Sequence, residues 1–78
     1  MPLQRDAPLP LSQQLAALLR SEINSGERPP GSRLPTIMQL ATQHEIATAT
    51  VVKALRILKH EGLVTGSTGH GTFVAEKE

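Results

Sequence analysis

One stretch of the sequence combines basic side chains with helical spacing, an arrangement suited to contacting phosphate groups. If residues 48–62 form a helix with about 100° between successive side chains, one face carries four residues together. They are Ala49, Lys53, Arg56 and His60. Three of the four can carry a positive charge, so this face suits the phosphates of a nucleic acid. An ordinary solvated helix face is the alternative interpretation of the same pattern.

The other polar residues form no pattern that is typical of catalysis or of metal binding. The histidines His44, His60 and His70 are expected in three different elements and are not spaced as an i,i+4 pair. The acidic residues are dispersed along the chain, and no nucleophile stands at a recognisable spacing from a base. We therefore expect no enzymatic activity, no metal site and no cofactor.

The composition restricts the chain to one small domain. It has 78 residues, 38% of them hydrophobic, with Phe73 as the single aromatic residue and no cysteine. The core must be aliphatic, and disulfides and thiolate zinc sites are excluded. No apolar run approaches the roughly 20 residues of a membrane span, and the N-terminus lacks the apolar stretch of a signal peptide. We expect a cytoplasmic domain without membrane contact.

The formal net charge of +1 is unevenly distributed along the chain. Residues 1–28 have equal numbers of acidic and basic side chains, whereas residues 29–75 hold four basic and two acidic ones, which leaves +2. Residues 76–78 contribute −1. The middle of the chain is therefore mildly basic, although less so than a nucleic-acid domain with a pI above about 9.

The N-terminal part of the chain predicts an extended arm followed by a helix. Residues 1–10 contain three prolines and should be extended. From Leu11 to Ile23 the apolar residues recur on one helix face, which predicts a helix over residues 11–25. Gly26 follows this segment and is typical of the residue that ends a helix.

A proline-rich turn should separate this helix from a second, shorter one. Pro29 and Pro30 cannot donate backbone hydrogen bonds, and residues 32–34 should form a short extended piece before the next proline. The Thr-x-x-Gln sequence at residues 36–39 has the form of a capping box, which predicts a helix of about two turns. Its expected buried positions are Ile37, Leu40 and Ala41.

The last elements expected are a third helix and a β-hairpin. The helix should begin near Thr48 and end at Gly62, and the side chains on its core face are expected to be Val51, Ala54, Leu55 and Leu58. Residues 63–65 and 72–75 have the pattern of strands around a glycine-rich tip. This order predicts an α+β fold that is mainly α: a winged helix-turn-helix over residues 11–75, with three helices and a C-terminal hairpin wing.

Four segments resemble the N-terminal domain of the GntR family of transcription regulators. They are Pro10–Leu15, Gly26–Pro35, Thr50–Leu63 and Gly69–Val74. The resemblance implies a sequence-specific domain that binds double-stranded DNA, with the third helix in the major groove and the wing on the adjacent minor groove or backbone. Family members usually carry a C-terminal domain that binds an effector and forms a homodimer. By this resemblance, residues 76–78 would begin the linker to such a domain.

The sequence departs from the family pattern at positions that usually contact DNA. The family arginine of the second helix is Met38 here, and the two arginines at the start of the third helix are Thr48 and Val52. The usual basic positions of the wing are Gly66, Ser67 and His70. Because an arginine–guanine pair is worth about 1–3 kcal/mol of discrimination, a guanine-containing operator is disfavoured.

We nevertheless expect contact with DNA through a different set of side chains. The expected residues are Thr36, Thr48, Ala49, Thr50, Val52, Lys53, Arg56, Ser67, Thr68, His70 and Gly71. Hydroxyl groups would bond to phosphates or bases, and Ala49 and Val52 would pack on thymine methyl groups of an A·T-rich half-site. Lys53, Arg56 and Lys59 would contact phosphates and fix the register on the duplex.

A second hypothesis treats the domain as a degenerate winged helix that docks on another protein. In that case Val52 and Ile57, apolar residues at the edge of the solvent-facing side of the third helix, would belong to a docking patch. Phe73 is expected to anchor the core from the last strand under both hypotheses. Thr36 is expected to cap the second helix under both, with a phosphate contact compatible with that role.

Overall fold

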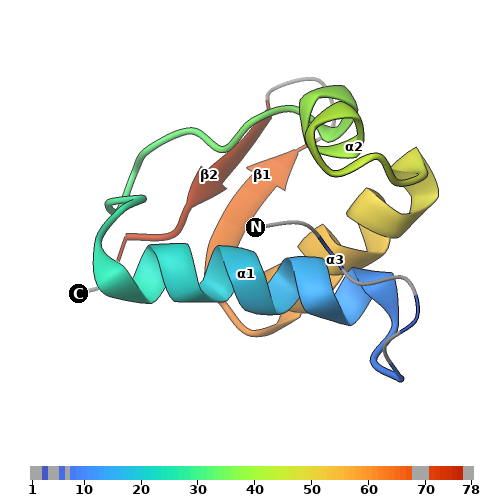
Figure 1. Ribbon diagram of the computed structural model, residues 1–78. Helices are drawn as coiled ribbons and strands as arrows, with labels where there is room; N and C mark the ends of the chain where they lie inside the picture. The colour runs from blue at the N-terminus through green and yellow to red at the C-terminus, as the bar shows by residue number, and fades with distance from the viewer. Residues whose placement is uncertain (1–2, 4–5, 7, 68–70, 77–78) are drawn as a thin grey trace.

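The computed structural model describes residues 3, 6, 8–67 and 71–76. Three helices, α1 (Leu11–Ser25), α2 (Ile37–His44) and α3 (Thr48–His60), precede an antiparallel hairpin of β1 (Val64–Ser67) and β2 (Gly71–Val74). In Figure 1, α1 lies across the front of α3, and the hairpin (left) and α2 (right) are both drawn above α1. The order of helices and strands is the one that the sequence predicts.

Helix α1 has the predicted bounds and supplies one wall of the core. Leu15, Ala16 and Leu19 are buried, in agreement with the apolar stripe of the sequence. The helix ends at Gly26, whose φ of 90° lies in the left-handed region. Glycine adopts that conformation without a steric penalty, so its place in the sequence explains where α1 stops.

Helix α3 supplies the opposite wall of the core. Its predicted core face is confirmed, since Val51, Ala54, Leu55 and Leu58 are buried. This face packs on α1 and α2, and the same cluster takes in Leu34, Leu40, Ala41, Val64 and Val74. An aliphatic core therefore joins all the elements, and the pattern of α3 alone indicated which of its sides would face it.

Two residues expected in the core lie elsewhere. Ile37 is 38% exposed because it lies at the N-terminal end of α2, one turn before the buried Leu40 and Ala41. Phe73 is half-buried, while its neighbour Val74 is buried. Successive side chains of a strand point to opposite faces, so with Val74 directed inward Phe73 must lie on the outer face of the hairpin. The core anchor in β2 is Val74, paired across the sheet with Val64.

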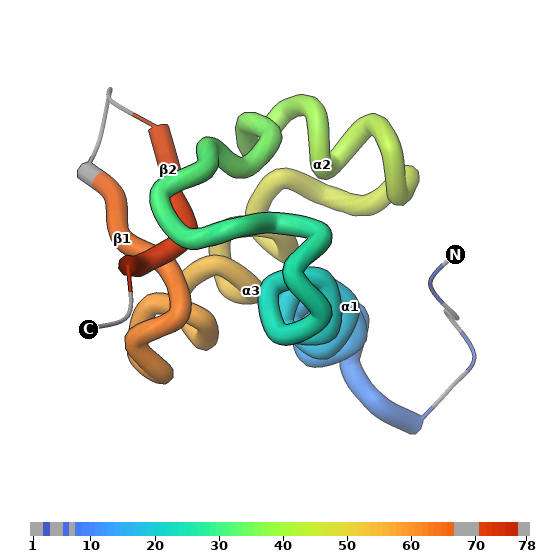
Figure 2. Tube along the Cα trace, turned by 90° about the vertical axis from the view of Figure 1, so that its left-hand side faces the viewer, coloured from blue at the N-terminus to red at the C-terminus, as the bar shows by residue number. Residues whose placement is uncertain are grey.

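The extended segment before α2 is hydrogen-bonded to β2. Its residues 31–34 run beside β2: the Gly31 amide donates to the Val74 carbonyl (2.9 Å), the Val74 amide to Ser32 (2.8 Å) and the Leu34 amide to Thr72 (2.8 Å). Figure 2 shows this segment beside β2 on its way from α1 to α2. The sequence predicted the extended backbone but not its pairing. The strands also differ from their predicted bounds of 63–65 and 72–75 by one or two residues.

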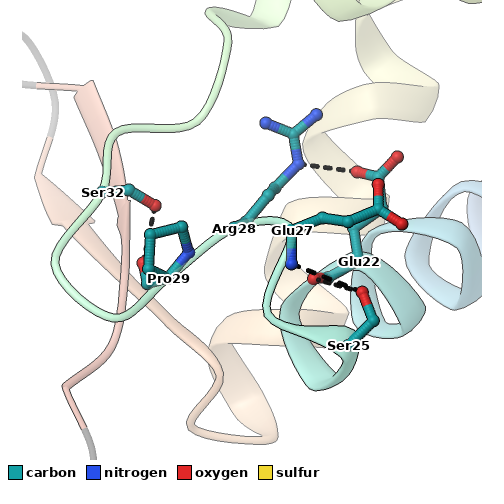
Figure 3. Close-up of polar contacts among 6 residues, drawn as sticks. All are labelled: Glu22, Ser25, Glu27, Arg28, Pro29 and Ser32. Carbon is teal, nitrogen blue, oxygen red and sulfur yellow. Dashed lines mark hydrogen bonds and ion pairs between the residues drawn. The ribbon is translucent and has the colours of Figure 1, made fainter.

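Side chains hold the turn between α1 and this segment (Figure 3). Arg28 donates to Glu22 at 2.6 Å, and the Ser25 hydroxyl donates to the Glu22 carbonyl at 3.1 Å. The Ser32 hydroxyl donates to the Pro29 carbonyl at 2.6 Å. The turn is therefore fixed to the end of α1 by polar contacts as well as by its prolines, and it delivers residues 31–34 to β2.

The predicted capping box begins α2. The Thr36 hydroxyl oxygen accepts a hydrogen bond from the backbone N–H of Gln39 (3.1 Å), and the side-chain oxygen of Gln39 accepts one from the backbone N–H of Thr36 (2.8 Å). Both partners satisfy backbone donors that the first turn of a helix leaves unpaired. A helix of only eight residues depends on such end contacts because it has few internal hydrogen bonds.

Loss of this cap should destabilise the domain measurably. Thr36→Ala is expected to lower the free energy of unfolding by about 1 kcal/mol, whereas Thr36→Ser, which keeps the hydroxyl, should lie near the wild type. Thr42→Ala, an exposed change later in α2, is the matched control and should cost less than about 0.5 kcal/mol. Urea unfolding of the four proteins tests this, and equal stability of the two alanine variants would contradict a capping role.

An ion pair links α1 to the end of α3. The Arg20 guanidinium donates to the two oxygens of Glu61 at 2.9 and 2.7 Å. These hydrogen bonds lower the pKa of the Glu61 carboxyl below its ordinary value. A carboxyl with a lowered pKa in the folded state stabilises the fold above its ordinary pKa, and that contribution is lost as the pH falls through the folded-state pKa.

The stability of the domain should therefore depend on pH partly through Glu61. Between about pH 5 and pH 2.5 the melting temperature of the wild type should fall more than that of Glu61→Gln, which cannot lose a charge. The difference should be small because water screens an exposed pair. Glu27→Gln, at an exposed carboxylate in the turn after α1, should follow the wild type. If the melting temperatures of the wild type and Glu61→Gln fell in parallel with pH, Glu61 would not contribute to the pH dependence of stability.

Candidate nucleic-acid interface

An open groove of about 750 Å³ lies between α3, the hairpin and the segment that leads into α2. Arg56, Lys59, Val52 and Leu55 of α3 line one side. The hairpin and residues 33–37 line the rest, through Arg33, Leu34, Thr36, Ile37, Val64, Thr65, Gly66, Gly71 and Thr72. The pairing of residues 31–34 with β2 places this segment opposite α3 and so creates the groove.

The groove is basic. Its lining includes Arg33, Arg56 and Lys59, each exposed, and no Asp or Glu is among the described residues that line it. The Lys59 ammonium donates to the Gly66 carbonyl at 3.3 Å, which holds this cation against β1. Three positive charges around one concave surface attract anions and favour the phosphates of a polyanion.

Two of the α3 side chains that the sequence singled out as DNA contacts, Val52 and Arg56, line the groove. Thr48 and Ala49 are exposed in its first turn, Val52 is half-buried in the groove wall, and Arg56 follows one turn later. Thr50 does not join them, because two residues along a helix turn a side chain by about 200°, away from the side of Val52.

Lys53 lies further round α3 than Arg56. It is exposed and lines a shallow hollow outside the groove, with Ser12, Arg56, Ile57, His60 and Glu61. Arg56 belongs to both surfaces, so the two cations form a continuous basic edge along α3. This edge is the exposed cationic face that the helical spacing predicted.

Thr36 lies at the groove end of α2, with its side chain engaged in the capping box. Its oxygen accepts from Gln39, while its hydroxyl hydrogen is left to donate. The position thus combines the structural role expected from the sequence with a donor that faces the groove lining.

Only part of the predicted wing site lies within the described residues. Gly71 opens β2 with a φ of 89°, a conformation that favours glycine, and pairs with Ser67 at the end of β1. Thr68 and His70 fall outside the described part of the chain.

Arg33 is the groove residue that sequence analysis missed. The signal was present, because Arg33 is the single cation between Pro29 and the start of the second helix. It stands within the Gly26–Pro35 motif, from which the sequence predicts a turn and an extended piece but no ligand contact. Its place in the groove depends on the pairing with β2, some forty residues further along the chain, which local spacing does not indicate.

Two structural features are absent from the described residues: a membrane-spanning helix and a metal-binding cluster. None of the described helices is both long and apolar enough to cross a membrane. No three histidine, aspartate or glutamate side chains in the described ranges come together in a way that could hold a metal ion.

Comparison with curated proteins identifies close relatives. The chain is 38% identical over 71 residues to the histidine utilization repressor of Pseudomonas aeruginosa, covering 91% of this chain and 28% of that protein. It is 36% identical over 76 residues to the HTH-type transcriptional repressor NagR of Bacillus subtilis, covering 97% of this chain and 31% of NagR. The chain thus spans less than a third of the length of these relatives.

Solved structures share the fold. YtrA from Sulfolobus acidocaldarius, a GntR-family transcription factor, superposes with a TM-score of 0.90 at 28% identity, covering 97% of this chain and 80% of YtrA. AraR(DBD) in complex with operator ORX1 superposes with a TM-score of 0.85 at 32% identity, covering 96% of this chain and 99% of that one. These neighbours confirm the expected winged helix-turn-helix.

The family comparison covers the helices and the hairpin together. Residues 11–74 match the family described as "Bacterial regulatory proteins, gntR family", a span from the first residue of α1 to the last residue of β2. This is a family of regulators, which agrees with the expectation that the domain is not an enzyme. The resemblance inferred from the sequence motifs is confirmed: the chain belongs to the gntR family of bacterial regulatory proteins.

Proposed function

We propose that this chain is the sequence-specific DNA-binding domain of a bacterial transcription regulator. The observation that carries the proposal is the basic groove between α3 and the hairpin, whose described lining holds three cations and no carboxylate. The operator complex of AraR(DBD), at 32% identity, supports the same use of the fold. In this proposal α3 enters the major groove, and the wing lies on the adjacent minor groove or backbone.

Helix α3 supplies the base contacts. Thr48 and Ala49 are exposed at its N-terminal end, from which short side chains reach base edges. Val52, on the groove wall, packs on a thymine methyl group, which favours an A·T-rich half-site. Thr50 is proposed as a weaker participant, because its direction on the helix differs from that of Val52.

The remaining proposed residues contact the sugar–phosphate backbone. Lys53 and Arg56 form the basic edge of α3 and set the register on the duplex without reading bases. Thr36 donates its hydroxyl hydrogen to a phosphate at the start of α2. The wing contributes Ser67, Thr68, His70 and Gly71, whose roles come from the family resemblance.

The whole protein is proposed to act as a cytoplasmic repressor that binds DNA as a homodimer. The relatives support this, because two of them are named as repressors and this chain spans less than a third of their length. We infer that dimerisation and effector binding reside in a C-terminal domain. Two domains joined in this way would bind a palindromic operator more tightly than one, because the second contact becomes intramolecular.

The structure offers little support for the alternative of a protein-docking module. Val52 and Ile57 were the apolar residues of the hypothetical patch, but they are five residues apart and therefore lie about 140° apart around α3. Val52 lines the groove, whereas Ile57 lines the hollow on the other side of Arg56. They do not form one surface, and both are partly covered by the fold.

A salt titration tests DNA binding directly. With three to five phosphate contacts, affinity for random duplex DNA should fall about 40- to 500-fold between 50 and 200 mM salt, because each contact releases counterions. The double variant Lys53→Gln/Arg56→Gln should lower the slope of log affinity against log salt by about 2. Fluorescence anisotropy measures the affinity and its salt dependence for both proteins. An affinity that does not change with salt concentration would refute the proposal in favour of protein docking.

Val52 provides a test of the recognition helix. Val52→Arg should strengthen binding to DNA in general and shift the preferred half-site toward G·C, because arginine pairs with guanine in the major groove. Selection of bound duplexes from a random pool measures the shift. Ala17→Arg, at an exposed position of α1, adds the same charge outside the groove and should leave the preference unchanged. An unaltered preference for Val52→Arg would show that this side chain does not face the bases.

A further inference from the structure

Arg33 packs along β2 although it belongs to the segment before α2. Its backbone forms an antiparallel bridge with Phe73, and its guanidinium carbon lies 6.0 Å from the centre of the Phe73 ring. That distance is at the outer reach of a cation–π contact, roughly 6 Å. The aromatic residue that was expected in the core thus lies beneath an arginine instead.

The guanidinium extends along β2 as far as Gly71. A Cβ atom built on Gly71 would lie 2.9 Å from Nε and 3.1 Å from Nη2 of Arg33. Phe73 and Gly71 are alternate residues of β2, so they share one face of the strand. Arg33 therefore extends along this face from the Phe73 ring to the backbone of Gly71.

The same guanidinium remains available for a ligand. Arg33 is exposed, and in the described part of the chain no carboxylate forms an ion pair with it, whereas Arg28 and Arg20 are each bound to a glutamate. Arginine carries five N–H donors in a planar fork that matches the geometry of a phosphate. A cation–π contact with the ring uses none of these N–H groups as a hydrogen-bond donor, so they remain available to a phosphate.

Its position completes the positive border of the groove. Arg33 lies across the groove from Arg56 and Lys59, and it also lines a second hollow with Arg28 and Thr36. The sequence of the hairpin, residues 63–75, contains neither lysine nor arginine. Arg33 therefore brings to the hairpin side of the groove a permanent positive charge that this stretch does not encode.

We propose that Arg33 is a DNA-phosphate contact of the wing, positioned by the Phe73 ring and by the absence of a side chain at Gly71. The proposal rests on the DNA-binding function above and adds a residue and a positioning pair to it. A phosphate is the partner, rather than a base, because the guanidinium is held along β2 between Phe73 and Gly71.

The first test removes the charge at position 33. Arg33→Met keeps a long apolar stem and should weaken binding to every duplex alike. It should also reduce the slope of log affinity against log salt by about 1, the effect of one lost phosphate contact. Arg20→Met removes the same charge from α1, outside the groove lining, and should leave the slope unchanged. Circular dichroism melting establishes that each variant is folded at the assay temperature.

The second test separates positioning from mere structure. Phe73→Leu should lower the affinity for DNA about two- to fivefold, the effect of an exposed cation–π contact, while the charge remains. In the Arg33→Met background the same change should have no further effect, because there is no guanidinium left to position. A general weakening of the fold would instead lower the affinity equally in both backgrounds, and that result would overturn the positioning role.

The outcomes distinguish this inference from the proposed function. A wild-type affinity that is insensitive to salt would refute DNA binding itself. A steep wild-type slope that is unchanged in Arg33→Met would refute the contact at Arg33 alone. A shift in base preference in the random-pool selection, with an unchanged slope, would overturn the assignment to phosphate.

Discussion

The backbone pairing between residues 31–34 and β2 is the constraint on which the groove depends. Three hydrogen bonds of 2.8–2.9 Å join the start of the helix-turn-helix to the end of the chain. They bring Leu34 and Val74 into one core cluster and place Arg33 beside Gly71. Without them the hairpin would contact the helices mainly through α3 and β1. The wing would then have no fixed distance from α2, and the groove between them would have no defined width.

The residues that pack the core are separate from those on the surface that faces DNA. The core is built from leucine, valine and alanine, and no polar or charged side chain is buried in the described residues. The departures from the family pattern on the helices lie outside it: Met38 is 68% exposed, Thr48 is exposed and Val52 is half-buried. Substitution there changes contacts with a ligand and leaves the packing largely intact. This is why a family scaffold survives while its usual arginines are absent.

The features that could be predicted from the sequence are those specified by neighbouring residues. The stripe of α1, its end at Gly26, the capping box and the core face of α3 each follow from spacings of a few positions. The features that were missed depend on distant partners. The aromatic type of Phe73 favours burial, but Val64 and Val74, which are paired across the sheet, are the residues of the hairpin that pack in the core. Arg33 likewise depends on a distant partner, because its bridge to Phe73 of β2 brings it to the groove.

Residues 31–34 and their partners in β2 are about forty positions apart in the sequence. This separation affects the order in which the domain folds during synthesis. A ribosome releases the three helices before β2 emerges, and domains are built from the N-terminus during synthesis. The helices can pack through contacts that are nearer in sequence, but the segment before α2 must wait for residues 72–74, the last part of the hairpin. A nascent chain that lacks those residues can therefore have its helices without its binding surface, so the competence to bind an operator arises with the final strand.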